Sequence, residues 1–198
     1  MKIMKQFKKI FAVIPFFILS CTGTQYVKNY EPINVFLEKE IIDKRIIEKG
    51  GKYILQTDKA SNAIVLRIFN GSEGSEHIAD PHYYINDGLF VEKHWKRMYK
   101  RYINDTIKKY WKKEDFPKYD FILENSRDWP KLPYKSAKYL DYEVMTISEP
   151  MYYRNKRYIM FYLSTSYFSS GASPQVVVMK KEKGKWIVDR TMWEEVYY

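Results

Sequence analysis

The chain has 198 residues and a formal net charge of +10, and 45% of its residues are hydrophobic and 18% aromatic. This apolar content excludes an intrinsically disordered chain, and the length corresponds to one domain with a core of its own. A single cysteine excludes an internal disulfide and a zinc site built from several cysteines. We therefore expect a fold that its hydrophobic core alone stabilises.

The first twenty residues have the composition of a secretory signal peptide. Their first nine residues contain four lysines and no acid, and an uninterrupted apolar run follows from residue 10 to residue 19. A basic head before a short apolar segment is typical of such signals. A ten-residue helix rises about 15 Å, half of a hydrocarbon core of roughly 30 Å, so the run is too short to span a membrane. We predict that residues 1–20 are removed.

The end of the apolar run resembles the lipobox of bacterial lipoproteins. It reads Ile18-Leu19-Ser20-Cys21, which is aliphatic residues, a small residue and then cysteine. The resemblance implies cleavage before Cys21 and acylation of its thiol and its new amine, with fatty acids such as palmitate. Several acyl chains on one residue give durable anchoring. Thr22 stands where Asp would retain a lipoprotein at the inner membrane, which implies the outer membrane of a Gram-negative bacterium. A Gram-positive cell and an unmodified secreted protein are the alternatives.

Three segments follow from this interpretation: the signal peptide (1–20), a lipidated N-terminus and tether (21–30), and a single domain (31–198). Without the signal peptide the chain keeps 30 basic and 24 acidic residues, a net charge of +6. In a cell envelope, an anionic glycan or lipid surface or an envelope protein is the natural partner for such charge. We expect no nucleic acid partner.

The first half of the domain is predicted to contain a helix, two strands and a long helix. Residues 31–42 begin with Glu-Pro and repeat apolar residues at helical spacing. Residues 52–57 and 63–69 have the composition of strands. From about residue 89 to residue 112, apolar residues fall at steps of three and four, which predicts a long amphipathic helix.

The other face of this long helix is basic. Its cations are Lys93, Lys96, Arg97, Lys100, Arg101, Lys108, Lys109, Lys112 and Lys113. One interpretation is a positive surface that docks on anionic headgroups, on lipopolysaccharide phosphates or on an acidic partner. The other is the solvated face of a helix whose apolar stripe covers a sheet.

The C-terminal third has the pattern of an antiparallel meander. Trp129-Pro130 and Leu132-Pro133 argue against regular structure before it. Strands are then predicted at residues 142–147, 157–168, 175–181 and 185–191, with a tight turn at Lys183-Gly184 before the last of them. The edges of such a sheet need cover, and the helices can supply it. We predict the α+β fold class, with the meander packed against helices.

Short motifs between residues 89 and 191 resemble a group of small, uncharacterised exported lipoproteins of Gram-negative bacteria. They are Leu89-Phe90, residues 111–116 (Trp-Lys-Lys-Glu-Asp-Phe), Ile147-Ser148-Glu149-Pro150 and the ending at residues 180–188 with its Gly-Lys-Trp. The resemblance implies no particular activity. A Gly-Lys-Trp ending on a curved meander is also similar to cone-shaped domains of the nuclear-transport-factor-2 type, at the level of the fold alone.

Residues 70–88 are the longest segment without a predicted element, and loops of this length often function. They hold Glu76, His77, Asp80 and His82, whose side chains are of the types that bind a divalent metal such as zinc. The spacing matches no zinc motif, so the simpler interpretation is a polar loop with exposed histidines. We predict no bound metal and no cofactor.

Catalytic motifs are not evident in the sequence. Ser169, Ser170, Ser173 and His94 are of the right types for a hydrolase, but no Gly-x-Ser-x-Gly elbow is present. The leading hypothesis is a membrane-anchored envelope lipoprotein that binds a partner without catalysis. The alternative is a small envelope hydrolase or a metal-binding protein with its site in the 70–88 loop.

Overall fold

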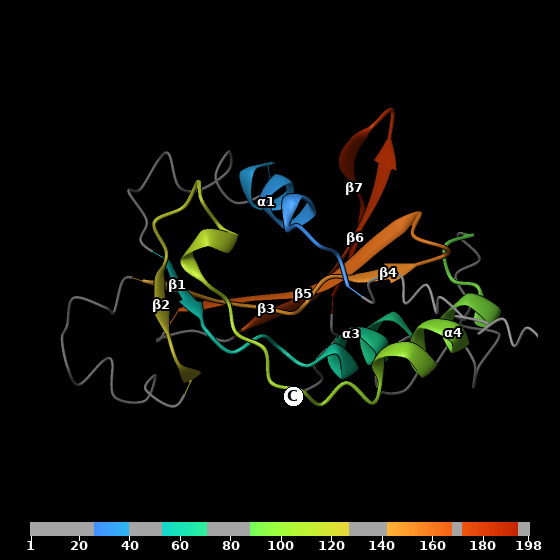
Figure 1. Cartoon of the computed structure of the whole chain (residues 1–198), viewed down its shortest axis with the longest axis horizontal. Coiled ribbons are helices and arrows are strands. Elements are labelled where there is room, and N and C mark those ends of the chain that lie inside the picture. The colour runs from blue at the N-terminus through green and yellow to red at the C-terminus, as the bar shows by residue number, and fades with distance from the viewer. Residues whose placement is uncertain (1–25, 40–52, 71–87, 127–141, 168–171, 194–198) are drawn as a thin grey trace, which may run out of the picture.

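The computed structural model describes residues 26–39, 53–70, 88–126, 142–167 and 172–193, and one mixed sheet with helices on both faces organises them (Figure 1). The helices are α1 (Glu31–Phe36), α3 (Asn62–Phe69) and α4 (Glu92–Tyr102), with a 3₁₀ turn at Lys113–Asp115. The strands are β1 (Tyr53–Gln56), β2 (Ile122–Glu124), β3 (Glu143–Ile147), β4 (Met151–Tyr153), β5 (Tyr158–Tyr167), β6 (Ser173–Glu182) and β7 (Lys185–Trp193). The predicted α+β class is confirmed.

The sheet has the strand order β2-β1-β3-β5-β6-β7, and β4 pairs with β5 outside this path. β1 runs parallel to both of its neighbours, β2 and β3. From β3 onward all pairs are antiparallel, so the predicted C-terminal meander is confirmed. Its last turn has φ 47° at Lys183 and 82° at Gly184. Two left-handed residues match the twist of the flanking strands, as in the common two-residue hairpins.

Each face of the sheet has a core of its own, because side chains alternate along β5 and β6. The core under α1 takes from these strands Ile159, Phe161, Leu163, Val177 and Met179. The core against α3 and α4 takes from them Met160, Val176 and Val178. Figure 1 shows α1 on one side of the sheet and the pair α3 and α4 on the other. The sheet is therefore a wall shared by two cores.

The prediction of a second strand at residues 63–69 is wrong, because this segment is helix α3. The Ser61 hydroxyl accepts a hydrogen bond from the Ala63 N–H at 3.2 Å and caps the helix. The buried side chains fall at helical spacing, at Val65, Leu66, Ile68 and Phe69. A short apolar run rich in β-branched residues fits a strand and a buried helix equally well, and the contacts with the sheet decide for the helix here.

The long helix predicted up to residue 112 is also wrong in its length, because α4 ends at Tyr102. Further along, Tyr110 bridges to Asp58, and the Trp111 N–H donates to the Thr57 carbonyl at 2.8 Å. Trp111 belongs to the core on the α1 face, whereas Met98 and Tyr102 belong to the opposite core. The continuous apolar stripe of the sequence thus combines two segments that bury their side chains on different faces of the sheet.

Three smaller features complete the fold. The predicted N-terminal helix begins as expected, with Pro32 in its first turn, but its α-helical part ends at Phe36 and residues 37–39 form a π-helical turn. Residues 40–42 of that prediction lie outside the described residues. Strands β2 and β4 were not predicted, and each has three residues. Among the described helices, none combines the length and the apolar character that a membrane crossing requires.

Candidate functional site

Several residues singled out by the sequence lie outside the part of the chain that the structure describes. They are Cys21, the predicted lipidation site, and His77, Asp80 and His82, the candidate metal ligands of the 70–88 loop. Lipidation, and the alternative of a hydrolase or metal site in that loop, therefore stay predictions. Within the described ranges, no three His, Cys, Asp or Glu side chains gather closely enough to hold a metal ion.

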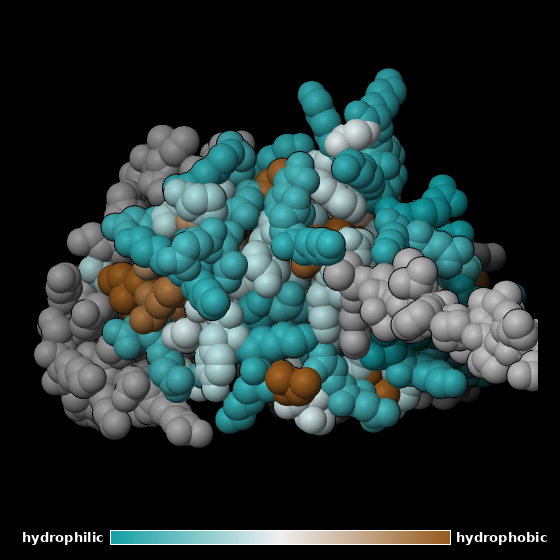
Figure 2. Space-filling model, viewed as in Figure 1, coloured by the Kyte–Doolittle hydropathy of each residue, from teal (hydrophilic) through white to brown (hydrophobic). Residues whose placement is uncertain are grey.

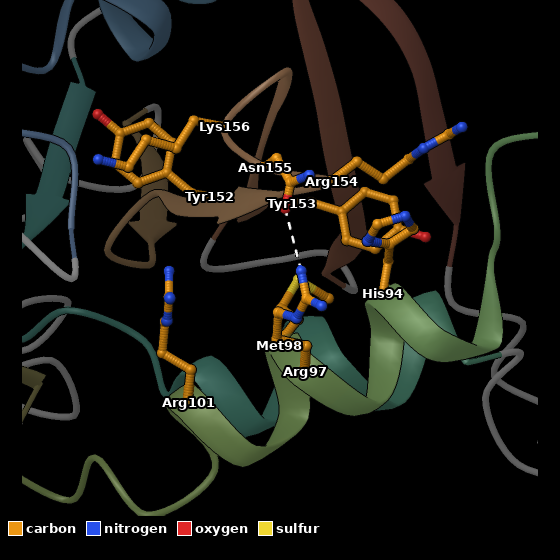
Figure 3. A pocket seen from close by; sticks show the side chains of 9 residues that line it. All are labelled: His94, Arg97, Met98, Arg101, Tyr152, Tyr153, Arg154, Asn155 and Lys156. Atoms are coloured by element: carbon orange, nitrogen blue, oxygen red, sulfur yellow. Dashed lines mark hydrogen bonds between the residues drawn. The ribbon is translucent and has the colours of Figure 1, made fainter. Parts of the chain in front are cut away.

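A hollow of about 290 Å³ lies between helix α4 and the turn that joins β4 to β5 (Figure 3). Nine described residues line it: His94, Arg97, Met98, Arg101, Tyr152, Tyr153, Arg154, Asn155 and Lys156. We call it the basic hollow. Four of these residues are basic, three arginines and one lysine, and the described lining contains no carboxylate.

Helix α4 supplies one wall of the basic hollow through a single helical face. His94, Arg97 and Arg101 are three and four residues apart, a spacing that places side chains one above the other along a helix. Met98 and Tyr102 are buried and fix the rotation of the helix against the sheet. The Tyr102 hydroxyl also accepts a hydrogen bond from the Tyr152 N–H at 3.1 Å, which joins the helix to β4.

The β4–β5 turn supplies the opposite wall. Arg154, Asn155 and Lys156 have φ angles of 46°, 56° and 67°, so three successive non-glycine residues are left-handed. This conformation costs each of them roughly 1–2 kcal/mol and is often found at functional sites. Arg97 donates to the Asn155 side-chain oxygen at 3.1 Å, as Figure 3 shows, and Arg154 donates to the Gly88 carbonyl at 2.6 Å. These bonds hold the turn against α4 and against Gly88, four residues before α4 begins.

The electrostatic field in the basic hollow is positive. The pKa of His94 lies below its usual value, first because of partial burial and then because of the positive charges of Arg154, Arg97 and Lys93. Guanidinium groups donate several hydrogen bonds in a fixed plane, and they bind phosphate and carboxylate groups well. The arrangement is therefore suited to hold an anion between the helix and the turn.

A second hollow, of about 150 Å³, lies beside a buried ion pair. The Lys59 ammonium is 2.5 Å from the Glu149 carboxylate, and the two side chains are only 6% and 8% exposed. Lys59 also donates to the Tyr30 hydroxyl at 2.8 Å and lies 3.9 Å above the ring of Trp111. The indole of Trp111 in turn donates to the Ile147 carbonyl at 3.1 Å. These groups satisfy one another's charges and hydrogen bonds. Because they come from different parts of the chain, they also join the N-terminal segment, the β1–α3 connection and the end of β3.

No protein family, curated protein or solved structure matches this chain. The candidate site therefore rests on its own distances and charges.

The sequence indicated only half of the basic hollow. Arg97 and Arg101 belong to the basic face predicted for the long helix, and the structure places them in the hollow. Arg154, Asn155 and Lys156 were not singled out, although a run of basic residues around an asparagine between tyrosine-rich segments is a signal for a turn. What the sequence could not give is the pairing of this turn with α4, because about fifty residues separate them.

Proposed function

We propose that the protein is a lipid-anchored, non-catalytic binding protein of the cell envelope that captures anionic groups in its basic hollow. The observation that carries the proposal is the composition of the hollow: Arg97, Arg101, Arg154 and Lys156 converge from two elements, and no described lining residue is acidic. Keeping like charges together is unfavourable for folding, and a strained turn holds two of them there. A bound anion would offset both costs.

The lipobox-like sequence supports anchoring through Cys21, at the outer membrane of a Gram-negative envelope. Metabolic labelling with an alkyne fatty acid tests this part. The label should attach to the wild-type protein and fail to attach to Cys21→Ser. Equal labelling of the two proteins would contradict lipidation at this residue.

Titration with inorganic phosphate tests the hollow, with the imidazole NMR signals of His94 as the reporter. The signal is assigned by its loss in His94→Gln. Phosphate should shift it, and Arg97→Gln combined with Arg101→Gln should weaken the apparent affinity about tenfold or more, because each charge-assisted hydrogen bond contributes about 1.5–3 kcal/mol.

The matched control removes the same charge elsewhere, through Lys113→Gln and Lys118→Gln, two exposed lysines that do not line the hollow. This control should bind phosphate as the wild type does. A His94 signal that phosphate leaves in place, or that shifts equally in both double variants, would contradict anion binding in the hollow.

A further inference from the structure

The first described residue, Tyr26, is held in place by contacts from four parts of the chain. Its hydroxyl donates to the Asp105 carboxylate and accepts from the Asn62 side-chain amide at 2.7 Å. The Lys109 ammonium lies 3.4 Å from the centre of its ring, and the ring of Tyr102 lies 5.2 Å away. An isolated β-bridge joins Tyr26 to Met151, the residue before Tyr152 of the basic hollow. Tyr26 is therefore a fixed point on the surface of the domain, next to both α4 and β4.

The covalent path from this fixed point to the predicted lipid is short. Five residue steps separate Cys21 from Tyr26, and even a fully extended chain spans no more than about 18 Å over them. A domain of this length is roughly 40 Å across. A lipid on Cys21 would thus keep the surface around Tyr26 within about 18 Å of the bilayer.

The surface around Tyr26 has the composition of a membrane-binding surface. Residues 104–110, which connect α4 to Trp111 and which we call the 104–110 segment, contain Asp105 and Lys109 of the contacts above. This segment also exposes Ile107 to 76% of its full area, next to the exposed Lys108. Figure 2 shows a largely hydrophilic surface with small, separate apolar patches. Apolar side chains beside basic ones are the combination with which interfacial helices bind anionic membranes, and the 104–110 segment offers the same combination on a smaller scale without a helix.

The acids near this surface do not cancel its charge. Asp105 is paired with Lys109 at 2.8 Å and accepts the Tyr26 hydrogen bond. Partial burial opposes its ionisation, but the hydrogen bonds from Lys109 and Tyr26 outweigh that effect and keep the pKa of Asp105 below its usual value. Glu92, at the other end of α4, is paired with Lys96. Lys108 adds an exposed positive charge next to Ile107, and the described lining of the basic hollow contains no acid.

We propose that the 104–110 segment and the basic hollow dock on the anionic lipid headgroups of the membrane that holds the protein, with Ile107 entering the interface. This inference rests on the proposed function, since it assumes the lipid on Cys21 and the anion-binding hollow. It adds the source of the anion: the phosphates of the bilayer itself. The tether length and the contacts of Tyr26 favour the bilayer over a soluble partner, because they hold the hollow within reach of the headgroups.

The test uses the lipidated protein in vesicles with a single added cysteine, because the acylated Cys21 does not react with thiol reagents. Ile107→Cys is labelled with an environment-sensitive fluorophore. Its emission should shift to the blue, and nitroxides on lipids should quench it, when phosphatidylcholine vesicles also contain phosphatidylglycerol. Neutralising Arg101 or Lys108 with glutamine should lower the ratio of docked to undocked protein about fivefold each, and high salt should lower it further.

The matched control places the same label at Lys185→Cys, an exposed position at the tip of the β6–β7 hairpin, on the side of the sheet away from α4 (Figure 1). This label should stay in water in every vesicle. A label at residue 107 that behaves like the one at residue 185 would overturn the docking proposal. If phosphate still shifts His94 in that case, anion binding stands and the anion comes from a partner in solution. If the protein leaves the vesicles on washing, the anchor itself is wrong.

Discussion

At the scale of single residues, the buried pair of Lys59 and Glu149 shows how a charge becomes part of a core. Each group loses most of its water, and each regains partners: the opposite charge, the Tyr30 hydroxyl and the face of Trp111. Burial, and after it the Glu149 carboxylate, raise the pKa of the Tyr30 hydroxyl, so this group stays protonated as a donor. A pair of this kind contributes little when complete and costs much when one partner is removed.

We expect Glu149→Gln to lower the free energy of unfolding by about 3–5 kcal/mol, because it leaves the Lys59 charge buried without its counter-ion. Urea denaturation measures the change. Asp120→Asn is the matched control, because Asp120 is 94% exposed and pairs with Lys113 on the surface. This substitution should cost less than about 1 kcal/mol. Equal effects of the two substitutions would show that the buried pair does not behave as described.

His94 predicts a dependence of stability on pH. Its pKa in the folded protein lies below 6.5, the ordinary value expected in the unfolded chain. Below that value the unfolded state binds a proton that the folded state resists, so the free energy of unfolding should fall as the pH decreases from about 7 to about 5. His94→Gln should make this part of the profile flatter. A profile that is unchanged in His94→Gln would contradict the lowered pKa of His94.

At the scale of elements, helix α3 can be distinguished from the predicted strand by mutation. In a strand, Arg67 would share a face with Val65 and Phe69, whereas in the helix it is exposed between buried turns. Leu66→Ala should therefore cost about 2–5 kcal/mol, and Arg67→Ala less than about 0.5 kcal/mol. Ser61→Ala should cost about 1 kcal/mol through the lost cap. Chemical denaturation measures all three, and a large effect at Arg67 would argue against the helix.

The elements that the sequence predicts well are those with a strong local signal. The alternation in β5 and the turn at Lys183-Gly184 are visible without knowledge of the neighbours, and both are confirmed. The apolar run of α3 has no such signal, since its choice between helix and strand depends on what it packs against. The apolar stripe that ends at Trp111 led to a helix predicted too long for a related reason. Spacing along the sequence does not show on which face of the sheet each residue is buried. The β4–β5 turn in the basic hollow could not be predicted for a similar reason, because sequence spacing does not show which distant segment packs beside α4.

At the scale of the whole molecule, the two cores are mechanically linked because β5 and β6 belong to both. Phe161 and Met160 are neighbours in β5 and lie in opposite cores. Neither face can lose its packing without loosening the strands that support the other. The domain should therefore unfold in a single transition.

Fluorine-labelled tryptophan makes this testable, since Trp111 reports on one face and Trp95 packs against the core of the other. Their NMR signals should change at the same urea concentration. Phe161→Ala removes a ring from the α1 side and should cost about 3–5 kcal/mol, yet it should shift both transitions equally. Separate midpoints for the two tryptophans would mean that the cores unfold independently.

The position of β1 between β2 and β3 has a consequence for how the polypeptide is made. Residues 53–56 pair on both sides with segments at 122–124 and 143–147, which leave the ribosome roughly seventy and ninety residues later. At about 5–20 residues per second, this strand waits several seconds for its partners. The sheet cannot close while the chain is still growing through this region. A nascent chain whose sheet has not yet formed is still unfolded, and an unfolded chain can be threaded through a translocation channel. This property suits the export that we propose.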